Sequence, residues 1–304
     1  RGFSLYYTPT KPSSNINIDN SYTVDNFGGE MYYGIPVSDY DTLSAGFGYD
    51  HIIISNVNLN TIAAGPLEFL IQHGFNPNNP NSVELNQLHV TGGWTHATLD
   101  RAVFPTHGSV NVFGVTIGPG IFGKSANYYK ITYQGRWYIP VGHGFIMHPH
   151  RLLVYVDSFT RVQTLPYIYN FYGGGIGTLP GFEANSLGPK NPLNGGAAIG
   201  GNLEMFAGID FVFPNPFNNK LRTAIIINAG NIYQTHSPSL SNPNFLGIIE
   251  SLDKISFRTI RASVGLKGIW YSPLGPIVVT LAVPIHKLPG DRSQVFGFSF
   301  GTAI

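Results

Sequence analysis

Three histidines in the middle of the chain are the residues whose type and spacing most resemble a chemical site. His148 and His150 are two positions apart, so in a strand their side chains share one face, and His143 precedes them. Two imidazoles suit a transition metal, but a zinc site takes three or four protein ligands, and no Cys or neighbouring Glu completes the set. The pair also flanks Pro149 beside a predicted turn. We therefore expect loop or interfacial histidines and no metal.

The glycine-rich part of the chain gives no support for nucleotide chemistry. Gly173, Gly174 and Gly175 are not followed by the Lys and Ser or Thr of a phosphate-binding loop, so the run indicates a flexible loop. A net charge of +1 at pH 7 gives no reason to expect nucleic acid as a partner. We expect neither enzymatic activity nor a cofactor.

Charged residues are scarce for a water-soluble protein. They make up 11% of the 304 residues, against roughly 25% in an average soluble domain, while 43% of the residues are hydrophobic and 13% aromatic. The exposed helix faces of a soluble helical enzyme would be rich in Glu and Lys, so this class is disfavoured. The aromatic content is too high for a disordered chain.

Two stretches without charge are long enough to cross a membrane, yet neither suits a helix. Residues 162–182 contain two prolines, and residues 268–285 contain three, which an uninterrupted helix in lipid does not accommodate. Strands of about 9–11 residues also cross a membrane, provided that they belong to a closed barrel. The composition fits this second solution.

Alternation with a period of two predicts such strands. Near the C-terminus, Ile260, Ala262, Val264, Leu266 and Trp270 alternate with Thr259, Arg261, Ser263 and Lys267, and similar patterns recur around 43–50, 129–137, 202–211 and 296–304. One face is apolar and aromatic, and the other carries small and polar residues, which suits lipid outside and water inside. We predict an all-β fold, an antiparallel transmembrane β-barrel; a water-soluble β-sandwich is the alternative that this pattern leaves open.

About twelve strands are expected, with connections that alternate between short and long. The strands are predicted near 2–8, 22–36, 42–57, 84–98, 108–118, 127–139, 151–160, 197–213, 221–234, 256–271, 276–285 and 294–304. Membrane barrels have short periplasmic turns and long outer loops, so an even number of strands places both termini on the periplasmic side. A short helix is expected within 61–74. Arg136, Arg222, Arg261, Lys130 and Lys267 would face Glu204 and Asp210 inside the barrel, as solvated lining rather than an ion filter.

Six ordered segments resemble the BamA-type outer-membrane barrel assembly proteins. Residues 99–108 are similar to the family's LDR-x-x-FPT-x-G turn, 165–175 and 181–190 to its long sixth outer loop, 200–202 to the start of the next strand, 272–276 to its late periplasmic turn, and 296–304 to its C-terminal β-signal. The family usually ends in an aromatic residue, whereas this chain ends in Ile304. The resemblance covers essentially the whole chain and argues against the sandwich.

The resemblance implies a single domain over residues 1–304. The family barrel has sixteen strands and is preceded by periplasmic POTRA domains. This chain starts at the position of the fifth strand, so we expect it to lack the POTRA domains and the first four strands. It is then either a fragment of that barrel or a short member that closes with twelve strands.

The sixth loop departs from the family pattern. The family carries an Arg-Gly-Phe or Arg-Gly-Tyr triplet there, whose Arg reaches two carboxylates on the barrel wall. The matching positions here are Pro180, Gly181 and Phe182 in the loop, and Asp210 and Asn228 on the wall. The loop has lost its Arg, at Pro180, and the wall has lost one carboxylate, at Asn228. These two losses are consistent, because a buried carboxylate without its cation is costly. We expect the loop to fold into the lumen, held by packing and backbone hydrogen bonds.

The function that the resemblance implies is the folding and insertion of β-barrel proteins into the bacterial outer membrane. Strands would be added at a lateral seam beside the last strand, at Phe296, Gly297, Phe298, Phe300, Gly301 and Ile304. Expected partners are outer-membrane lipids, nascent outer-membrane β-barrel proteins and, through the missing periplasmic domains, accessory assembly lipoproteins. The alternative is a passive or two-partner-secretion-type outer-membrane pore.

Overall fold

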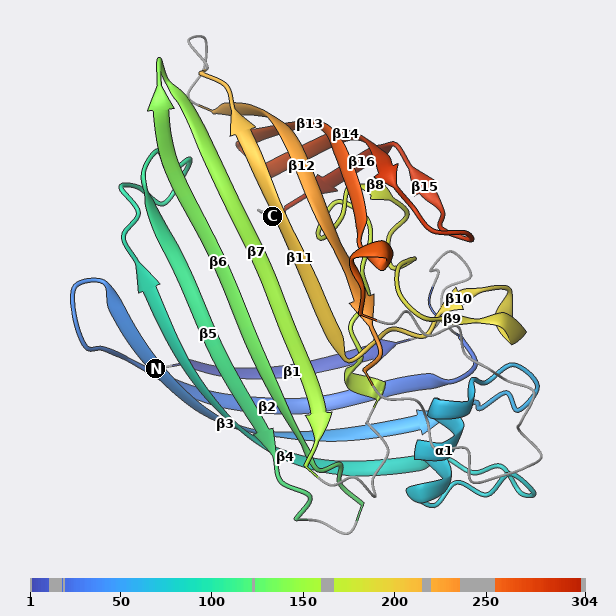
Figure 1. The fold of residues 1–304 in the computed structure, drawn as a ribbon. Helices are drawn as coiled ribbons and strands as arrows, with labels where there is room; N and C mark the ends of the chain where they lie inside the picture. The colour runs from blue at the N-terminus through green and yellow to red at the C-terminus, as the bar shows by residue number, and fades with distance from the viewer. Residues whose placement is uncertain are drawn as a thin grey trace.

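Twelve strands form one antiparallel sheet in which each strand pairs with its neighbours in chain order (Figure 1). The structure, a computed structural model, describes residues 2–10, 18, 20–121, 124–159, 167–214, 220–235 and 255–301. The strands of the sheet are β1 (Gly2–Thr10), β2 (Thr23–Pro36), β3 (Asp41–Ser55), β4 (Val83–Ala97), β5 (Gly108–Gly118), β6 (Tyr128–Gly142), β7 (Phe145–Ser158), β11 (Leu203–Val212), β12 (Leu221–Tyr233), β13 (Arg261–Ser272), β14 (Gly275–His286) and β16 (Phe296–Phe300). The predicted all-β antiparallel architecture and its number of strands are confirmed.

The strands form where β-branched and aromatic residues alternate with small or polar ones. In β12, Ile225 and Ile227 are exposed, whereas Ile226 and Asn228 between and beside them are buried. The same alternation in β13 exposes Leu266 and buries Ser263. We call the face with the exposed apolar side chains the outer face, and the face with Asn228 and Ser263 the inner face.

The connections at one end of the sheet are mostly shorter than those at the other. The short-loop end has the turns 37–40, 98–107, 143–144, 213–220 and 273–274, and the long-loop end has the connections 11–22, 56–82, 119–127, 159–202, 234–260 and 287–295. The expected alternation of short and long connections is therefore present except at 98–107, whose ten residues exceed the nine of 119–127 and of 287–295.

The long-loop end carries the smaller elements. Helix α1 (Ala64–Gln72) lies within the predicted range, and its Leu67, Phe69 and Leu70 pack on Ile54 and Leu85 of β3 and β4. The remaining elements are η1 (Tyr167–Tyr169), η2 (Pro192–Asn194), η4 (Phe257–Thr259) and the two-residue strands β8 (Gly181–Phe182), β9 (Lys190–Asn191), β10 (Ala197–Ala198) and β15 (Ser293–Gln294). No helix in the described ranges is long and apolar enough to cross a membrane.

The seventh strand starts earlier than predicted, at Phe145 instead of residue 151. Pro149 indicated a turn in the sequence, but it lies inside the strand and pairs with Ile209 of β11. On the β6 side the register passes from Arg136↔His150 to Ile139↔Met147, so the ladder has no pair at Pro149, which lacks an N–H to donate. Of the two placements expected for His148 and His150, loop or interface, the loop is therefore wrong.

Candidate functional site

The long loop between β7 and β11 packs on the inner face of the sheet through Phe182. This side chain is fully buried and packs with Leu179 and Leu187 of the loop. The same cluster contains Phe206 of β11 and Ile232 of β12, which project from the inner face. The structure therefore places Phe182 between its own loop and the wall of the sheet.

Gly181 brings the loop backbone close to the wall. Its φ is +96°, a left-handed value that side chains resist, and a Cβ built there would lie 3.2 Å from the Cβ of Ser263. Strand β8 also pairs with β15, with Gly181 opposite Gln294 and Phe182 opposite Ser293. The left-handed conformation favours glycine at this position, and a side chain there would press against the wall.

The other three predicted anchor residues surround one small cavity. Pro180, Asp210 and Asn228 line a cavity of about 90 Å³ between the loop and the inner face. Asp210 and Asn228 are each 4% exposed. The structure thus brings together the loop and wall positions that the sequence resemblance paired, although Pro180 offers no charge to the wall.

A lysine on the wall provides the cation for Asp210. Lys267 of β13 donates to the Asp210 carboxylate with an Nζ–Oδ2 distance of 3.3 Å. His148 and His150 of β7 approach the same carboxylate, at 3.5 Å and 3.4 Å. Asp210 therefore has partners from two other strands and needs none from the loop. No group of His, Cys, Asp or Glu in the described part of the chain could hold a metal ion.

A second ion pair, between Arg261 and Asp291, was not foreseen from the sequence. The Arg261 guanidinium donates to both Asp291 oxygens, each at 2.8 Å, and also to Asn231. Arg261 is 2% exposed, so this bidentate pair is buried. The backbone N–H of Glu183 donates to the carbonyl of Arg292 at 3.1 Å. The pair thus fastens the 287–295 connection to β13, and that connection holds the long loop.

The turn between β4 and β5 leans across the inner face at the short-loop end. Arg222 of β12 donates to the Pro105 carbonyl at 2.9 Å and lies 4.7 Å from the centre of the Phe104 ring. Phe104 also meets Tyr271 of β13 edge to face at 4.9 Å. A cavity of about 320 Å³ lies beneath the turn, lined in part by Arg136 and Lys267. Lys267 pairs with Asp210 and Arg222 supports a turn, so neither cation is merely solvated lining.

Asp100 stabilises this turn from within. Its carboxylate accepts hydrogen bonds from the Thr106 N–H at 2.8 Å, the Thr106 hydroxyl at 2.6 Å and the His107 N–H at 3.3 Å. Desolvation acts to raise the pKa of Asp100, but these hydrogen bonds prevail and hold it well below its usual range. The turn that resembles the family sequence is therefore organised around one carboxylate.

The last strand, β16, is short and lies at one edge of the sheet. It pairs with β14 only over Phe296–Phe300, whereas β13 and β14 pair from Ala262 to Ser272 and from Gly275 to His286. Phe296, Phe298 and Phe300 are exposed on the outer face, and Gly301 follows with φ +82°. Residues 297–301 have the spacing of a hydrolase nucleophile elbow, but Ser299 lies in the ladder and not on a strand-to-helix turn. Ile304 lies outside the described residues.

Comparisons with known proteins agree with this geometry. A family model described as the Omp85 superfamily domain matches residues 1–304. The chain is 28% identical to the outer membrane protein assembly factor BamA of Neisseria meningitidis serogroup B, over 99% of this chain and 39% of that protein. The chain therefore spans about two fifths of the length of this curated relative.

Two solved structures share the fold. The crystal structure of BamA from Haemophilus ducreyi lacking POTRA domains 1-3 matches with a TM-score of 0.82 and 24% identity, over 97% of this chain and 57% of that one. CdiB from Escherichia coli matches with a TM-score of 0.53 and 12% identity, over 97% of this chain and 48% of that one. At these identities, the likenesses concern the fold alone.

Proposed function

This chain belongs to the Omp85 superfamily. From that membership we propose that it forms part of the membrane-spanning barrel wall of an outer-membrane protein assembly factor. The observation that carries the proposal is the family match over all 304 residues, joined to a sheet whose wall residues meet the long loop as the BamA resemblance implies. The protein would lie in the bacterial outer membrane, with the short-loop end and both termini on the periplasmic side.

The two faces of the sheet support the membrane location. The outer face exposes large apolar side chains on every long strand, among them Met31, Phe47, Trp94, Phe113, Ile131, Leu153, Ile209, Ile227, Leu266 and Leu281. Strands β2 to β7 have 11 to 15 residues, enough to cross the hydrocarbon core at a tilt. The inner face holds the paired charges, as expected for a wet or loop-filled interior.

Client proteins would be received at the edge of β16. The strand has a short ladder with β14, and no described strand pairs with its other edge, so that edge is a template for a further strand. Gly297 weakens side-chain packing in the same strand. Partial opening here would cost less than at the fully paired β13–β14 ladder.

The proposed partners are membrane lipids and nascent outer-membrane β-barrel proteins. Accessory assembly lipoproteins would bind through periplasmic domains, as the family resemblance implies. Catalysis and a cofactor are not needed, because strand addition makes only hydrogen bonds and apolar contacts. The alternative, a passive or secretion pore, is less well supported, since the long loop packs on the inner face where a pore needs free cross-section.

A client-folding assay separates the two functions. The chain is reconstituted into vesicles, a urea-denatured outer-membrane barrel is added, and the folded client is measured by its resistance to unfolding in cold detergent. We expect the client to fold severalfold faster than in vesicles carrying the same amount of an unrelated porin. Ion conductance across the chain with no gain in client folding would favour the pore and contradict assembly.

A further inference from the structure

Arg151 is a cation on the largely apolar outer face. It lies in the middle of β7, with the outward Phe145 and Leu153 on the same face and His148 and His150 on the opposite one. The side chain is exposed. In the proposed membrane location, this position faces lipid, where an isolated guanidinium is strongly disfavoured. Its presence therefore needs a compensating partner.

The guanidinium is held in place by two aromatic rings. Its carbon lies 4.6 Å from the centre of the Tyr133 ring and 4.8 Å from that of Trp137, both on the outer face of β6. Nη2 donates to the Tyr133 hydroxyl at 2.6 Å, and that hydroxyl donates to Asn111 Oδ1 at 2.8 Å. Cation–π contacts and the hydrogen-bond chain fix the orientation of the guanidinium.

The guanidinium keeps hydrogen-bond donors that its two aromatic neighbours do not use. Arg151 pairs with Gly135 on β6, where the Trp137 ring and the Tyr133 hydroxyl cover the glycine, and with Ala207 on β11, whose side chain is small. Within the described ranges, Arg151 forms no ion pair with a carboxylate, and only one of its five N–H groups is used by the Tyr133 hydroxyl. The remaining donors can take a planar or tetrahedral oxyanion in a bidentate manner.

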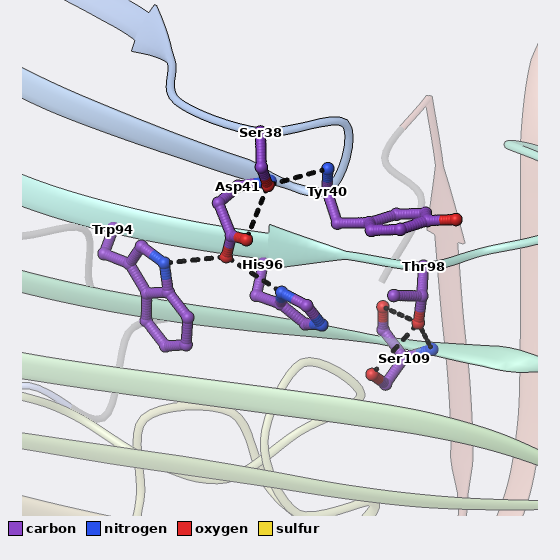
Figure 2. Close-up of polar contacts among 7 residues, drawn as sticks. All are labelled: Ser38, Tyr40, Asp41, Trp94, His96, Thr98 and Ser109. Atoms are coloured by element: carbon purple, nitrogen blue, oxygen red, sulfur yellow. Dashed lines mark hydrogen bonds and ion pairs between the residues drawn. The ribbon is translucent and has the colours of Figure 1, made fainter.

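Polar residues continue along the same line of paired positions. His96 pairs with Asp41 and with Asn111, Asn111 pairs with Gly135, and Gly135 pairs with Arg151. Figure 2 shows the far end of this row, where Asp41 accepts from Trp94 Nε1 at 3.0 Å and lies 2.9 Å from His96 Nδ1. A row of polar and aromatic side chains on an outer face is typical of the boundary between hydrocarbon and headgroups.

We propose that Arg151, positioned by Tyr133 and Trp137, binds the phosphate of a membrane phospholipid. This inference rests on the proposed membrane location but not on the assembly activity. The guanidinium would take two phosphate oxygens, and the Trp137 ring would pack against the glycerol and upper acyl carbons of the same lipid.

The test measures phospholipid binding to the whole chain. Delipidated protein in detergent is titrated with short-chain phosphatidylglycerol, and bound lipid is counted by native mass spectrometry. Arg151→Gln is expected to weaken binding at this site about tenfold or more, and Tyr133→Phe to weaken it less. Arg101→Gln is the matched control, because it removes one cation from an exposed turn, and it should bind like the wild type.

Two further ligands identify the source of the phosphate. Diacylglycerol with the same chains, which lacks phosphate, should bind equally weakly to the wild type and Arg151→Gln, and inorganic phosphate should compete only weakly. Equal phosphatidylglycerol binding by the wild type and Arg151→Gln would overturn the proposal, as would strong competition by inorganic phosphate. Insertion of both proteins into vesicles is checked in parallel, because its failure in the wild type would refute the membrane location itself.

Discussion

The buried carboxylate of Asp210 has partners on the inner face, because Lys267 of β13 and two histidines of β7 reach it. The family resemblance led us to expect a loop cation there, and Pro180 replaces it. A buried carboxylate must be paired or hydrogen-bonded to be tolerated. Here the cation that pairs with Asp210 comes from the wall instead of the loop. The loop is held by other contacts.

Removing the lysine should expose this dependence. Lys267→Met is expected to lower the free energy of unfolding by about 1–3 kcal/mol, because Asp210 keeps its histidine contacts but loses its permanent cation. The measurement is urea unfolding of the protein refolded in detergent. Asp210→Asn together with Lys267→Met should cost less than the sum of the two single changes, whereas additive costs would show that the two groups do not interact.

The pH dependence of the β4–β5 turn follows from Asp100. The pKa of Asp100 is lower in the folded protein than its ordinary value of about 3.9, so its contribution to stability is fully present above about pH 4 and is lost as the pH falls further. At pH 7, Asp100→Asn should therefore lower the concentration of guanidinium chloride that unfolds half of the protein. The difference between this midpoint and that of the wild type should shrink at pH 3. Asp39→Asn, in the exposed turn 37–40, serves as the control. A difference that does not change with pH would contradict this role.

At the scale of the elements, the strands were predictable because their side chains alternate, and burial in the structure follows this period clearly in β4, β11 and β12. The start of β7 was predicted too late because Pro149 suggested a turn. The sequence alone does not show that the β6–β7 ladder is interrupted there and that the strand continues. The Arg261–Asp291 pair was missed for a similar reason. Its partners are thirty positions apart, and only the folding of the 287–295 connection onto β13 brings them together.

The long loop should depend on one apolar side chain. Phe182→Ala is expected to destabilise the protein by about 3–5 kcal/mol, because it empties a fully buried site between the loop and the inner face. The measurement is the unfolding midpoint, with trypsin cleavage at Lys190 as a local readout of loop release. Phe300→Ala, on the exposed outer face, should change neither. Equal effects of the two substitutions would contradict the placement of the loop.

The assignment of the two faces is tested by adding charge to each. Leu266→Arg should destabilise the folded protein in bilayers by about 2–4 kcal/mol if the site lies near the midplane. Ser263 is a poor inner-face control, since it is buried beneath Gly181 and does not face water. Gln134→Arg, which lines the inner cavities, should cost much less. Similar costs in lipid refolding would contradict the outer face as we define it.

At the scale of the whole molecule, the fold combines a wall of long ladders with a short ladder at its C-terminal edge. Ten successive strand pairs, from β1–β2 to β13–β14, have long ladders, and the last pair, β14–β16, is short. The loop on the inner face is fastened to the 287–295 connection, directly before β16. If β16 separates from β14, this arrangement allows the movement to reach the loop through the 287–295 connection, while the other strands stay paired.

Disulfide trapping at the last strand tests the central claim most directly. The chain has no cysteine, so single cysteines can be placed at Phe298 of β16 and at Ile227 of β12, both exposed on the outer face. A client barrel with one cysteine in its terminal strand is added during folding in vesicles. We predict a mixed disulfide with Phe298→Cys and none with Ile227→Cys. Equal trapping at both positions, or trapping at Ile227 alone, would contradict strand addition at the edge of β16.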